Sequence, residues 1–264
     1  MQKDRIVNFI SRFVKKQAEH CTTSWGEPLV RFADAYHPEI QNLKNRISPA
    51  HGLPQEVLPD TKTVIVYFVP FTKELADTNR HLGELASPEW ALAYEETNAM
   101  FKELNSALIK ELESMGFAGQ VAPQTSTFDT NTLISGWSHR HFAWAAGLGT
   151  FGINNMLITK KGCCGRYNSI VTNVQTEHGK PLTEENCLYK RNGKCGVCMK
   201  RCPSGALTPE GFARHKCQEI LLKNAAIYNS FGTSYTDADG NSVSNGSDVC
   251  GKCVAGVPCS FTSL

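Results

Sequence analysis

The sequence of 264 residues predicts a mixed α/β (α+β) core over about residues 1–180 and a small cysteine-rich module over residues 181–264. Three observations support this division. Strand-like runs alternate with helical stretches in the first 180 residues, as they do in mixed α/β domains. No further strand-like run follows Thr176. Eight of the eleven cysteines lie at or after position 187.

The first elements of the core follow from local patterns. Residues 3–20 are expected to be helical, because their apolar side chains recur on one face between charged ones. Residues 63–69 are a continuous β-branched and aromatic run that ends at Pro70, which indicates a buried strand. Residues 88–115 carry an apolar stripe at helical spacing and precede Gly116, a residue typical of helix C-termini.

The later elements of the core are shorter. Residues 117–121 indicate a strand, and residues 134–146 a short helix. Two more strands are expected over residues 156–159 and 169–174, on either side of the turn Gly162-Cys-Cys-Gly165. Strands and helices thus alternate up to the start of the module.

Composition and charge exclude several classes of protein. No apolar run reaches the roughly 20 residues that a membrane-spanning helix needs. Charged residues interrupt the N-terminal helix, whereas a secretion signal needs a continuous apolar stretch, so a cytoplasmic protein is expected. The net charge is +2. One stretch is densely basic and contains Lys190, Arg191, Lys194, Lys200 and Arg201. This stretch could be a docking face for an acidic partner or a solvated rim, and less readily a nucleic-acid site.

The cysteine spacing in the module is close to that of bacterial ferredoxins. The first group reads Cys187-x7-Cys195-x2-Cys198-x3-Cys202-Pro203. The ferredoxin run is C-x2-C-x2-C-x3-C-P, and its last cysteine binds the other cluster. The second group reads Cys250-x2-Cys253-x5-Cys259, and it follows a polar stretch, residues 227–249, that is expected to be a long loop. An eighth cysteine, Cys217, stands alone on a helix expected over residues 209–226.

Exchanging the outer cysteines between the two groups predicts two [4Fe–4S] clusters. One cluster would be bound by Cys187, Cys195, Cys198 and Cys259. The other would be bound by Cys202, Cys217, Cys250 and Cys253. Two zinc sites need the same number of thiolates, and disulfides are a further alternative. The x2-x3-Pro spacing, the interleaved groups and the Ser-Gly-Ala segment after Pro203 favour iron–sulfur clusters over zinc, and the absence of a secretion signal disfavours disulfides.

From Leu58 to Cys259 the chain resembles the epoxyqueuosine reductase family, cobalamin-dependent proteins with two [4Fe–4S] clusters that are related to reductive dehalogenases. Residues 140–155, Arg-His-Phe-Ala-Trp-Ala-Ala-Gly-Leu-Gly-Thr-Phe-Gly-Ile-Asn-Asn, are similar to the family's segment E-R-x-x-A-x-x-A-G-L-G-W-x-G-K-N. Residues 213–217 resemble the family's helix with a lone cysteine. In the family, the outer cysteines are exchanged between the two clusters in the way predicted above. The resemblance implies a corrinoid-binding core joined to a two-cluster ferredoxin-like module.

In the family the glycine-rich segment lies against the corrin. The resemblance therefore implies that cobalamin is bound by Arg140, Gly147, Leu148, Gly149, Thr150, Phe151, Gly152, Asn154 and Asn155. Glycines in such a run permit positive φ and close approach of the backbone to a flat ligand. A plain tight turn before a strand is the alternative, and a phosphate-binding loop is excluded because no G-K-[ST] follows.

The sequence departs from the family where the substrate would be protonated. The family has an acidic residue just before its Glu-Arg pair, whereas residues 133–139 contain no carboxylate and the nearest acid is Asp129. His139 stands in place of the Glu, Arg140 is kept, and Ile153 replaces a lysine. Since histidine can transfer protons near neutral pH, His139 and Arg140 are the candidate catalytic residues. The adjacent Cys163 and Cys164 are expected to be buried or to line the turn.

These features predict an iron–sulfur redox protein that passes electrons through two clusters to a bound cobalamin. The main hypothesis is a corrinoid-dependent reductase or a reductive activator of a corrinoid, served by a low-potential electron donor and acting on a small molecule or a corrinoid protein. One alternative is a tRNA epoxyqueuosine reductase; tRNA is expected to be a less favoured partner, since the family's tRNA-modifying members continue beyond the position of Leu264. A second alternative is a two-cluster electron carrier without cobalamin.

Overall fold

The computed structural model describes residues 2–123, 128–129, 131–232 and 246–264. Its main sheet has four strands in the order β1 (Leu29–Asp34), β2 (Thr63–Pro70), β8 (Gly165–Thr172) and β3 (Gly119–Gln120). All three pairings are antiparallel. Every residue of β2 is buried, because this strand lies inside the sheet and both of its faces are covered.

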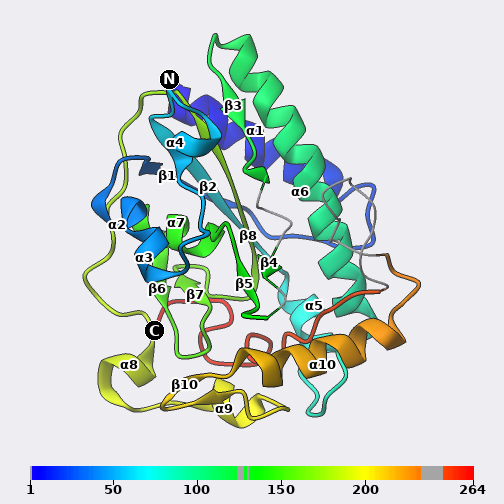
Figure 1. Ribbon diagram of the computed structural model, residues 1–264. Coiled ribbons are helices and arrows are strands. Elements are labelled where there is room, and N and C mark those ends of the chain that lie inside the picture. The colour runs from blue at the N-terminus through cyan, green and yellow to red at the C-terminus, as the bar shows by residue number, and fades with distance from the viewer. Residues whose placement is uncertain (1, 124–127, 130, 233–245) are drawn as a thin grey trace.

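The alternation of side chains along β2 separates two apolar layers. Ile65, Tyr67 and Val69 pack with apolar residues of α1 (Gln2–Gln17) and α6 (Pro88–Ser114). Val64, Val66 and Phe68 face the opposite layer, which contains α7 (His139–Ala145) and the short helices α2 (Pro38–Gln41), α3 (Leu43–Arg46) and α4 (Pro54–Val57). Figure 1 shows α1 and α6 on one side of the strands and α2, α3 and α7 on the other.

The remaining elements before residue 180 are short. Helix α5 (Lys73–Thr78) lies near the start of α6, which is capped by Ser87: its hydroxyl accepts a hydrogen bond of 3.1 Å from Trp90 N. Two hairpins complete this part. One pairs β4 (Phe128–Asp129) with β5 (Ile134–Ser135), and the other pairs β6 (Gly149–Phe151) with β7 (Leu157–Thr159).

The cysteine-rich segment forms a group of short elements at one end of the molecule (Figure 1). They are α8 (Leu188–Asn192), α9 (Val197–Arg201), the hairpin of β9 (Leu207–Thr208) and β10 (Gly211–Phe212), and α10 (Arg214–Ile227). A third apolar cluster joins this segment to the rest, since it contains Phe71 and Trp90 together with Cys187, Cys198 and Val254. The boundary at residue 180 remains a prediction.

The mixed α and β architecture predicted from the sequence is confirmed, with several differences. Strand β1 was not predicted, because its sequence Leu-Val-Arg-Phe-Ala-Asp lacks a long apolar run. Helix α7 begins at His139 rather than at residue 134, since Ile134–Ser135 pair with β4. The small β9–β10 hairpin follows Thr176, where no strand was expected. The loop expected over 227–249 lies largely outside the described residues. No described helix has the length and apolar character that crossing a membrane requires.

Candidate metal centre

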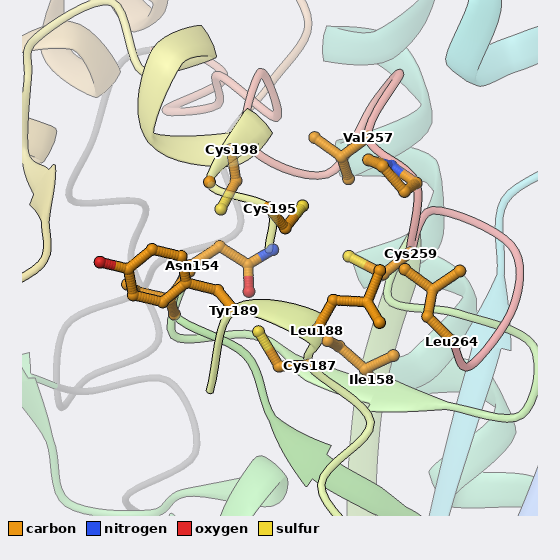
Figure 2. Close-up of a pocket in the computed structure, with 13 residues that line it drawn as sticks. Asn154, Ile158, Cys187, Leu188, Tyr189, Cys195, Cys198, Val257, Cys259 and Leu264 are labelled. Atoms are coloured by element: carbon orange, nitrogen blue, oxygen red, sulfur yellow. The ribbon is translucent and has the colours of Figure 1, made fainter. Parts of the chain in front are cut away.

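Four cysteines from separate parts of the chain line one pocket. Cys187, Cys195, Cys198 and Cys259 share its wall with apolar side chains, among them Ile158 and Val257. Figure 2 shows their thiols around the pocket, with Asn154 and Tyr189 also on its wall. The pocket contains about 330 Å³ of empty space, part of it open to solvent. These are the four residues that the ferredoxin spacing assigns to the first cluster.

The β6–β7 hairpin helps to hold the first of these cysteines. Asn186, which precedes Cys187, donates its backbone N–H to Thr150 Oγ1 at 2.8 Å and its side-chain amide to Ile158 O at 2.7 Å. Cys187 itself is the N-cap residue of α8. Cys198 is on α9, whose N-cap Gly196 has a φ of 95°, a conformation that glycine adopts at little cost.

Burial and neighbouring thiols act on Cys198 of this first set. The pKa of Cys198 is raised to about 12, mainly by burial and then by the neighbouring Cys259, Cys187 and Cys195. The neutral Cys198 thiol is therefore favoured in the metal-free protein, and a bound cation would reverse this preference. Within the described residues, no group of three or more His, Cys, Asp or Glu side chains has the arrangement that would hold a single metal ion.

The second predicted set is also brought together. The pKa of Cys217 on α10 is raised to about 11 by burial and then by the nearby Cys250 and Cys202. Burial likewise raises the pKa of Cys253, and Cys250, Cys217, Cys198 and Cys202 act on it in the same direction. The cysteines of the second set thus lie near one another, and Cys253 also lies near Cys198 of the first set. The division of the eight cysteines into two ligand sets remains a prediction.

Lys252, between two of these cysteines, is only 1% exposed. Its ammonium group donates to Asn79 Oδ1 at 2.9 Å and lies 3.1 Å from His81 Nε2. The pKa of Lys252 is lowered to about 8, mainly by burial. Asn79 also donates to Cys250 O at 2.8 Å, so this one side chain holds both the backbone and the cation beside the second set. Neither Lys252 nor Asn79 was predicted from the sequence.

The donor set fits a pair of [4Fe–4S] clusters. Such a cluster binds four thiolates, each to a different iron, so its ligands surround a volume rather than meet at a point. The first set meets this requirement because its four thiols line one pocket with largely apolar walls. Cationic side chains close to the second set, Lys252 and Arg140, would offset the negative charge of a thiolate-bound cluster.

Arg140 connects α7 to the turn of the β6–β7 hairpin. Its Nη1 donates to Asn155 O at 2.5 Å and lies 3.3 Å from Met156 Sδ. Burial lowers the pKa of Arg140, and Cys253 is close enough to act on it electrostatically. Arg140 is therefore a half-buried cation between the predicted corrin segment and the second cysteine set.

The predicted proton donor His139 is half-buried. Its Nδ1 lies 2.8 Å from Ser169 Oγ, which also accepts a hydrogen bond of 3.1 Å from Trp137 Nε1. The pKa of His139 is lowered to about 3, mainly by burial and then by the nearby Arg166 and Arg140. His139 is therefore neutral near pH 7 and carries no proton of ordinary acidity to give to a substrate. This disfavours the catalytic role expected for it.

A second histidine, which no sequence pattern singles out, positions the start of α7. His51 Nδ1 donates to Gly52 O at 2.7 Å, and His51 Nε2 accepts from Ser138 N at 3.0 Å. These partners require the neutral ring with its proton on Nδ1, since only an unprotonated Nε2 can accept. The ring is fully buried and stacks with Trp137 at a centroid distance of 6.0 Å.

The glycines of the predicted corrin segment are in contact with the chain itself. A Cβ at Gly147 would stand 2.2 Å from Lys180 O, and one at Gly149 would stand 2.2 Å from Ile158 O. At Gly152 it would meet Asn154 Oδ1 at 2.5 Å. On the side where a Cβ would stand, the atoms that lie close to these glycines therefore belong to the protein itself. This is what the tight-turn alternative predicts. They do not form an open cradle for a flat cofactor, and the corrin site remains a prediction.

The other residues of this segment are divided between interior and surface. Leu148 is buried in the core, and Thr150 holds Asn186. Asn154 is buried and donates to Cys253 O at 3.0 Å, so the hairpin also supports the second cysteine set. Phe151 and Asn155 are partly exposed, and Asn155 has a φ of 58°. Only the partly exposed members can touch a cofactor without a change in the hairpin.

Two carboxylates, the buried Glu95 and the half-buried Asp248, come from parts of the chain that no sequence pattern singles out. The pKa of Asp248 is raised to about 6, mainly by burial. The nearby Arg166 lowers this pKa, and Glu95 raises it. Arg166 lies over the ring of Tyr94 at 3.9 Å and donates to Asn98 Oδ1 at 2.8 Å. No sequence motif marks this polar group, because its members come from α6, β8 and the segment before Cys250.

We expect the free energy of unfolding to fall as the pH decreases below about 6.5. His139 and His141 have native pKa values of about 3 and about 4, both lowered by burial from 6.5. The unfolded chain then binds protons that the native chain does not. The stability that the two neutral histidines contribute is fully present above their unfolded pKa of 6.5. It is lost as the pH falls from 6.5 towards their native pKa values, by up to about 1.4 kcal/mol per pH unit for each histidine.

Urea denaturation between about pH 7.5 and about pH 5 measures this slope. His139→Gln should make the acid slope shallower, whereas His20→Gln at an exposed position should leave it unchanged. An equal slope in His139→Gln and the unsubstituted chain would show that His139 is not held neutral.

Comparisons with known proteins identify what the chain resembles. No family model matches it. It is 24% identical to an epoxyqueuosine reductase of Francisella cf. novicida over 177 residues, which are 66% of this chain and 47% of that protein. It is 26% identical to one of Bacillus cereus over 221 residues, 81% of this chain and 50% of that protein. The chain therefore spans about half the length of these curated relatives.

Solved structures show the same fold. A selenomethionine-labelled epoxyqueuosine reductase matches with a TM-score of 0.55 and 16% identity, over 96% of this chain and 66% of that chain. An epoxyqueuosine reductase with an epoxyqueuosine-modified tRNA stem loop matches with a TM-score of 0.54 and 17% identity, over the same shares. A catabolic reductive dehalogenase matches with a TM-score of 0.50 and 13% identity, over 77% of this chain and 28% of that chain. The predicted resemblance to epoxyqueuosine reductases is confirmed.

Proposed function

We propose that this chain, which resembles epoxyqueuosine reductases in sequence and fold, is an iron–sulfur oxidoreductase of that type. The observation that carries the proposal is the pocket lined by Cys187, Cys195, Cys198 and Cys259, with the other four predicted ligands grouped beside it. Electrons would enter at one cluster and pass to the other. The reductive reaction would take place near Arg140, which lies close to Cys253 of the second set.

Cobalamin is proposed as the further cofactor on the strength of the resemblance. When bound, it supplies a low-potential cobalt centre for reduction of an organic substrate. In this chain the partly exposed Phe151 and Asn155, with Arg140 behind them, are the members of the predicted segment that could contact it. The glycines of the segment lie close to atoms of the chain itself: Gly147 to Lys180 O, Gly149 to Ile158 O and Gly152 to Asn154 Oδ1.

The chain's own residues provide an electrostatic setting for reduction. Cys187 and Cys198 are buried and the other six predicted ligands are half-buried. Nearby charges therefore act more strongly on these thiols than they would at the surface. Lys252 is a buried cation and Arg140 a half-buried one, and both are close to the second cysteine set. Because a reduced cluster carries one more negative charge than an oxidised cluster, these cations favour the reduced state.

The proposed substrate is epoxyqueuosine in tRNA. From the sequence alone, a corrinoid-dependent reductase or reductive activator is the main hypothesis, and tRNA is a less favoured partner. The comparisons favour the alternative, because both curated relatives are named epoxyqueuosine reductase and one matching structure holds an epoxyqueuosine-modified tRNA stem loop. We therefore correct the order of the two hypotheses and place tRNA first among the partners.

A second candidate, reduction of a different substrate, is favoured by one observation. Residues 133–139 contain no carboxylate, and His139 is held neutral by burial. If protonation at this position is needed for epoxyqueuosine, another group must supply the proton. A corrinoid protein or a small molecule is then the alternative substrate.

Anaerobic reconstitution with iron and sulfide, followed by metal analysis and EPR spectroscopy, tests the proposed cofactors. We expect about eight iron atoms per chain and reducible cluster signals, since each cluster holds four irons. Added cobalamin should show an altered cob(II)alamin signal. Stoichiometric zinc without iron would contradict the proposal. Eight irons with no response from cobalamin would leave a two-cluster electron carrier.

The loaded protein can then be tested on its substrates. Turnover of epoxyqueuosine-containing tRNA to queuosine-containing tRNA would support the first candidate, with unmodified tRNA as the control. Reduction of a corrinoid protein without tRNA turnover would support the second. Both reactions need the same low-potential reductant, so a failure of one alone cannot be assigned to poor electron supply.

We expect an acidic protein donor to dock on the basic surface formed by Lys190, Arg191, Lys194 and Lys200. All four side chains are exposed, and each lies within four residues of a cysteine of the first set. The double substitution Lys190→Glu and Lys194→Glu should slow cluster reduction by an acidic ferredoxin about tenfold at low salt and weaken its dependence on ionic strength.

Stopped-flow absorption measures this rate. Photoreduction by a small deazaflavin serves as the internal control, because it needs no docking surface. Lys102→Glu with Lys110→Glu on α6 is the matched variant, since both side chains are exposed but lie away from α8 and α9. Equal slowing by both double variants would show that only net charge matters.

A further inference from the structure

Cys163 is a ninth cysteine at the proposed metal centre, outside the two predicted ligand sets. It lies in the Gly162-Cys-Cys-Gly165 turn and is fully buried. Its Sγ stands 3.9 Å from Sγ of Cys259, one of the four thiols of the first set. This distance is within reach of a hydrogen bond between sulfur atoms. The sequence analysis expected Cys163 only to be buried or to line the turn.

The backbone holds the two thiols side by side. Cys163 N donates to Cys259 O at 3.0 Å, and Cys164 N donates to Ser260 O at 3.0 Å. Gly162 lets the segments come this close: its φ is 78°, and a Cβ there would stand 2.2 Å from Ser260 O. The position of Cys163 relative to Cys259 is therefore set by backbone pairing, not by side-chain rotation alone.

A side chain on the other side of Cys163 orients its thiol. Asn154 Nδ2 lies 3.8 Å from Cys163 Sγ and 3.0 Å from Cys253 O. An amide nitrogen can only donate, so Cys163 Sγ accepts from Asn154 and keeps its own proton for a second partner. Cys259 Sγ is the neighbour in position to receive that proton, and a metal-bound thiolate is an acceptor.

We propose that Cys163 is a positioning residue that donates an S–H hydrogen bond to the Cys259 thiolate and thereby raises the reduction potential of the cluster on the first set. This inference rests on the proposed function, since it requires a cluster on Cys259. The physical reason is electrostatic. A donor aimed at a ligand sulfur stabilises the additional negative charge of the reduced cluster, and hydrogen bonds to the sulfurs are among the factors that set cluster potentials.

The test is a redox titration of the reconstituted full chain, monitored by EPR. Cys163→Ala and Cys163→Val both remove the donor, and the valine side chain also fills the space of the lost sulfur. Each should lower the potential of one cluster and leave the other unchanged. The expected change is about tenfold in the ratio of reduced to oxidised cluster at a fixed solution potential, which is about 59 mV for a one-electron couple. Cys163→Ser keeps a donor and should retain the original potential or raise it.

Cys164 offers the matched control. It is adjacent to Cys163 and equally buried, and burial alone raises its pKa, to about 12. Cys164→Ala and Cys164→Val should leave both potentials unchanged. An unshifted potential in Cys163→Ala and Cys163→Val with full iron content would overturn the inference while leaving the proposed function intact.

Two other results would also be decisive. Loss of about four irons from Cys163→Ala, but not from Cys259→Ala, would make Cys163 a ligand in place of Cys259 and overturn its role as a donor. Absence of iron–sulfur clusters from the unsubstituted chain would overturn the proposed function and this inference together.

Discussion

Cys202→Ser is expected to remove the same cluster as Cys217→Ser, and a different cluster from the one that Cys198→Ser removes. Cys202 follows Cys198 by four residues, yet the exchanged sets place them on different clusters. Cys202 is among the thiols that act on Cys217, whereas those that act on Cys198 are Cys259, Cys187 and Cys195. Each single variant should keep about four of the eight irons.

Iron analysis and EPR of pairs of variants measure this pattern. Cys202→Ser combined with Cys217→Ser should still keep about four irons, whereas Cys198→Ser combined with Cys217→Ser should keep none. Cys21→Ser, far from both sets in sequence, is the control and should keep all eight. If the pair Cys198→Ser and Cys202→Ser retained one complete cluster, the ligand exchange would be wrong.

Gly162→Ala is expected to destabilise the chain strongly and to deplete the first cluster. The φ of 78° costs a residue with a side chain about 1–2 kcal/mol. The added Cβ would also lie 2.2 Å from Ser260 O, a backbone atom that cannot rotate away. Separation of the two segments would move Cys259, which pairs with Cys163 across the same contact. We expect a loss of several kcal/mol and incomplete iron loading.

Gly193→Ala isolates the backbone part of this effect. Gly193 has a similar φ of 73°, but a Cβ there would meet nothing within 4 Å. The Gly193→Ala substitution should therefore lower the free energy of unfolding only by the backbone strain of about 1–2 kcal/mol, and the variant should keep its full iron content. Chemical denaturation and iron analysis of both variants provide the comparison. Similar losses in the two would show that the contact between Gly162 and Ser260 is unimportant.

Much of the fold follows from local sequence patterns. The buried run of β2 and the long apolar stripe of α6 were predicted nearly to their ends, because each has enough residues to show its period. Strand β1 was missed because an arginine and an aspartate interrupt a run of only six residues. Its place in the sheet depends on pairing with β2, which is a tertiary interaction and leaves no local signal.

The candidate site shows the same limit. Cysteine spacing grouped the eight predicted ligands, since a cluster imposes close intervals along the chain. The residues around them could not be found in this way. Asn79, Lys252 and Asn154 act through contacts between segments many residues apart. The glycines at 147–152 were assigned to a cofactor because a glycine pattern reports close approach but does not identify what approaches.

An apolar cluster joins Trp90 and Phe71 to Cys187 and Cys198. We expect this packing to make the lifetime of the whole protein depend on iron supply. Thiols in this cluster would be both core residues and metal ligands, so a chain without iron has its interior incompletely fixed. A ligand that binds only the folded state stabilises it by mass action. Under iron limitation, cells should therefore degrade the entire chain faster instead of accumulating an intact but inactive form. Pulse-chase turnover with and without an iron chelator would display this dependence.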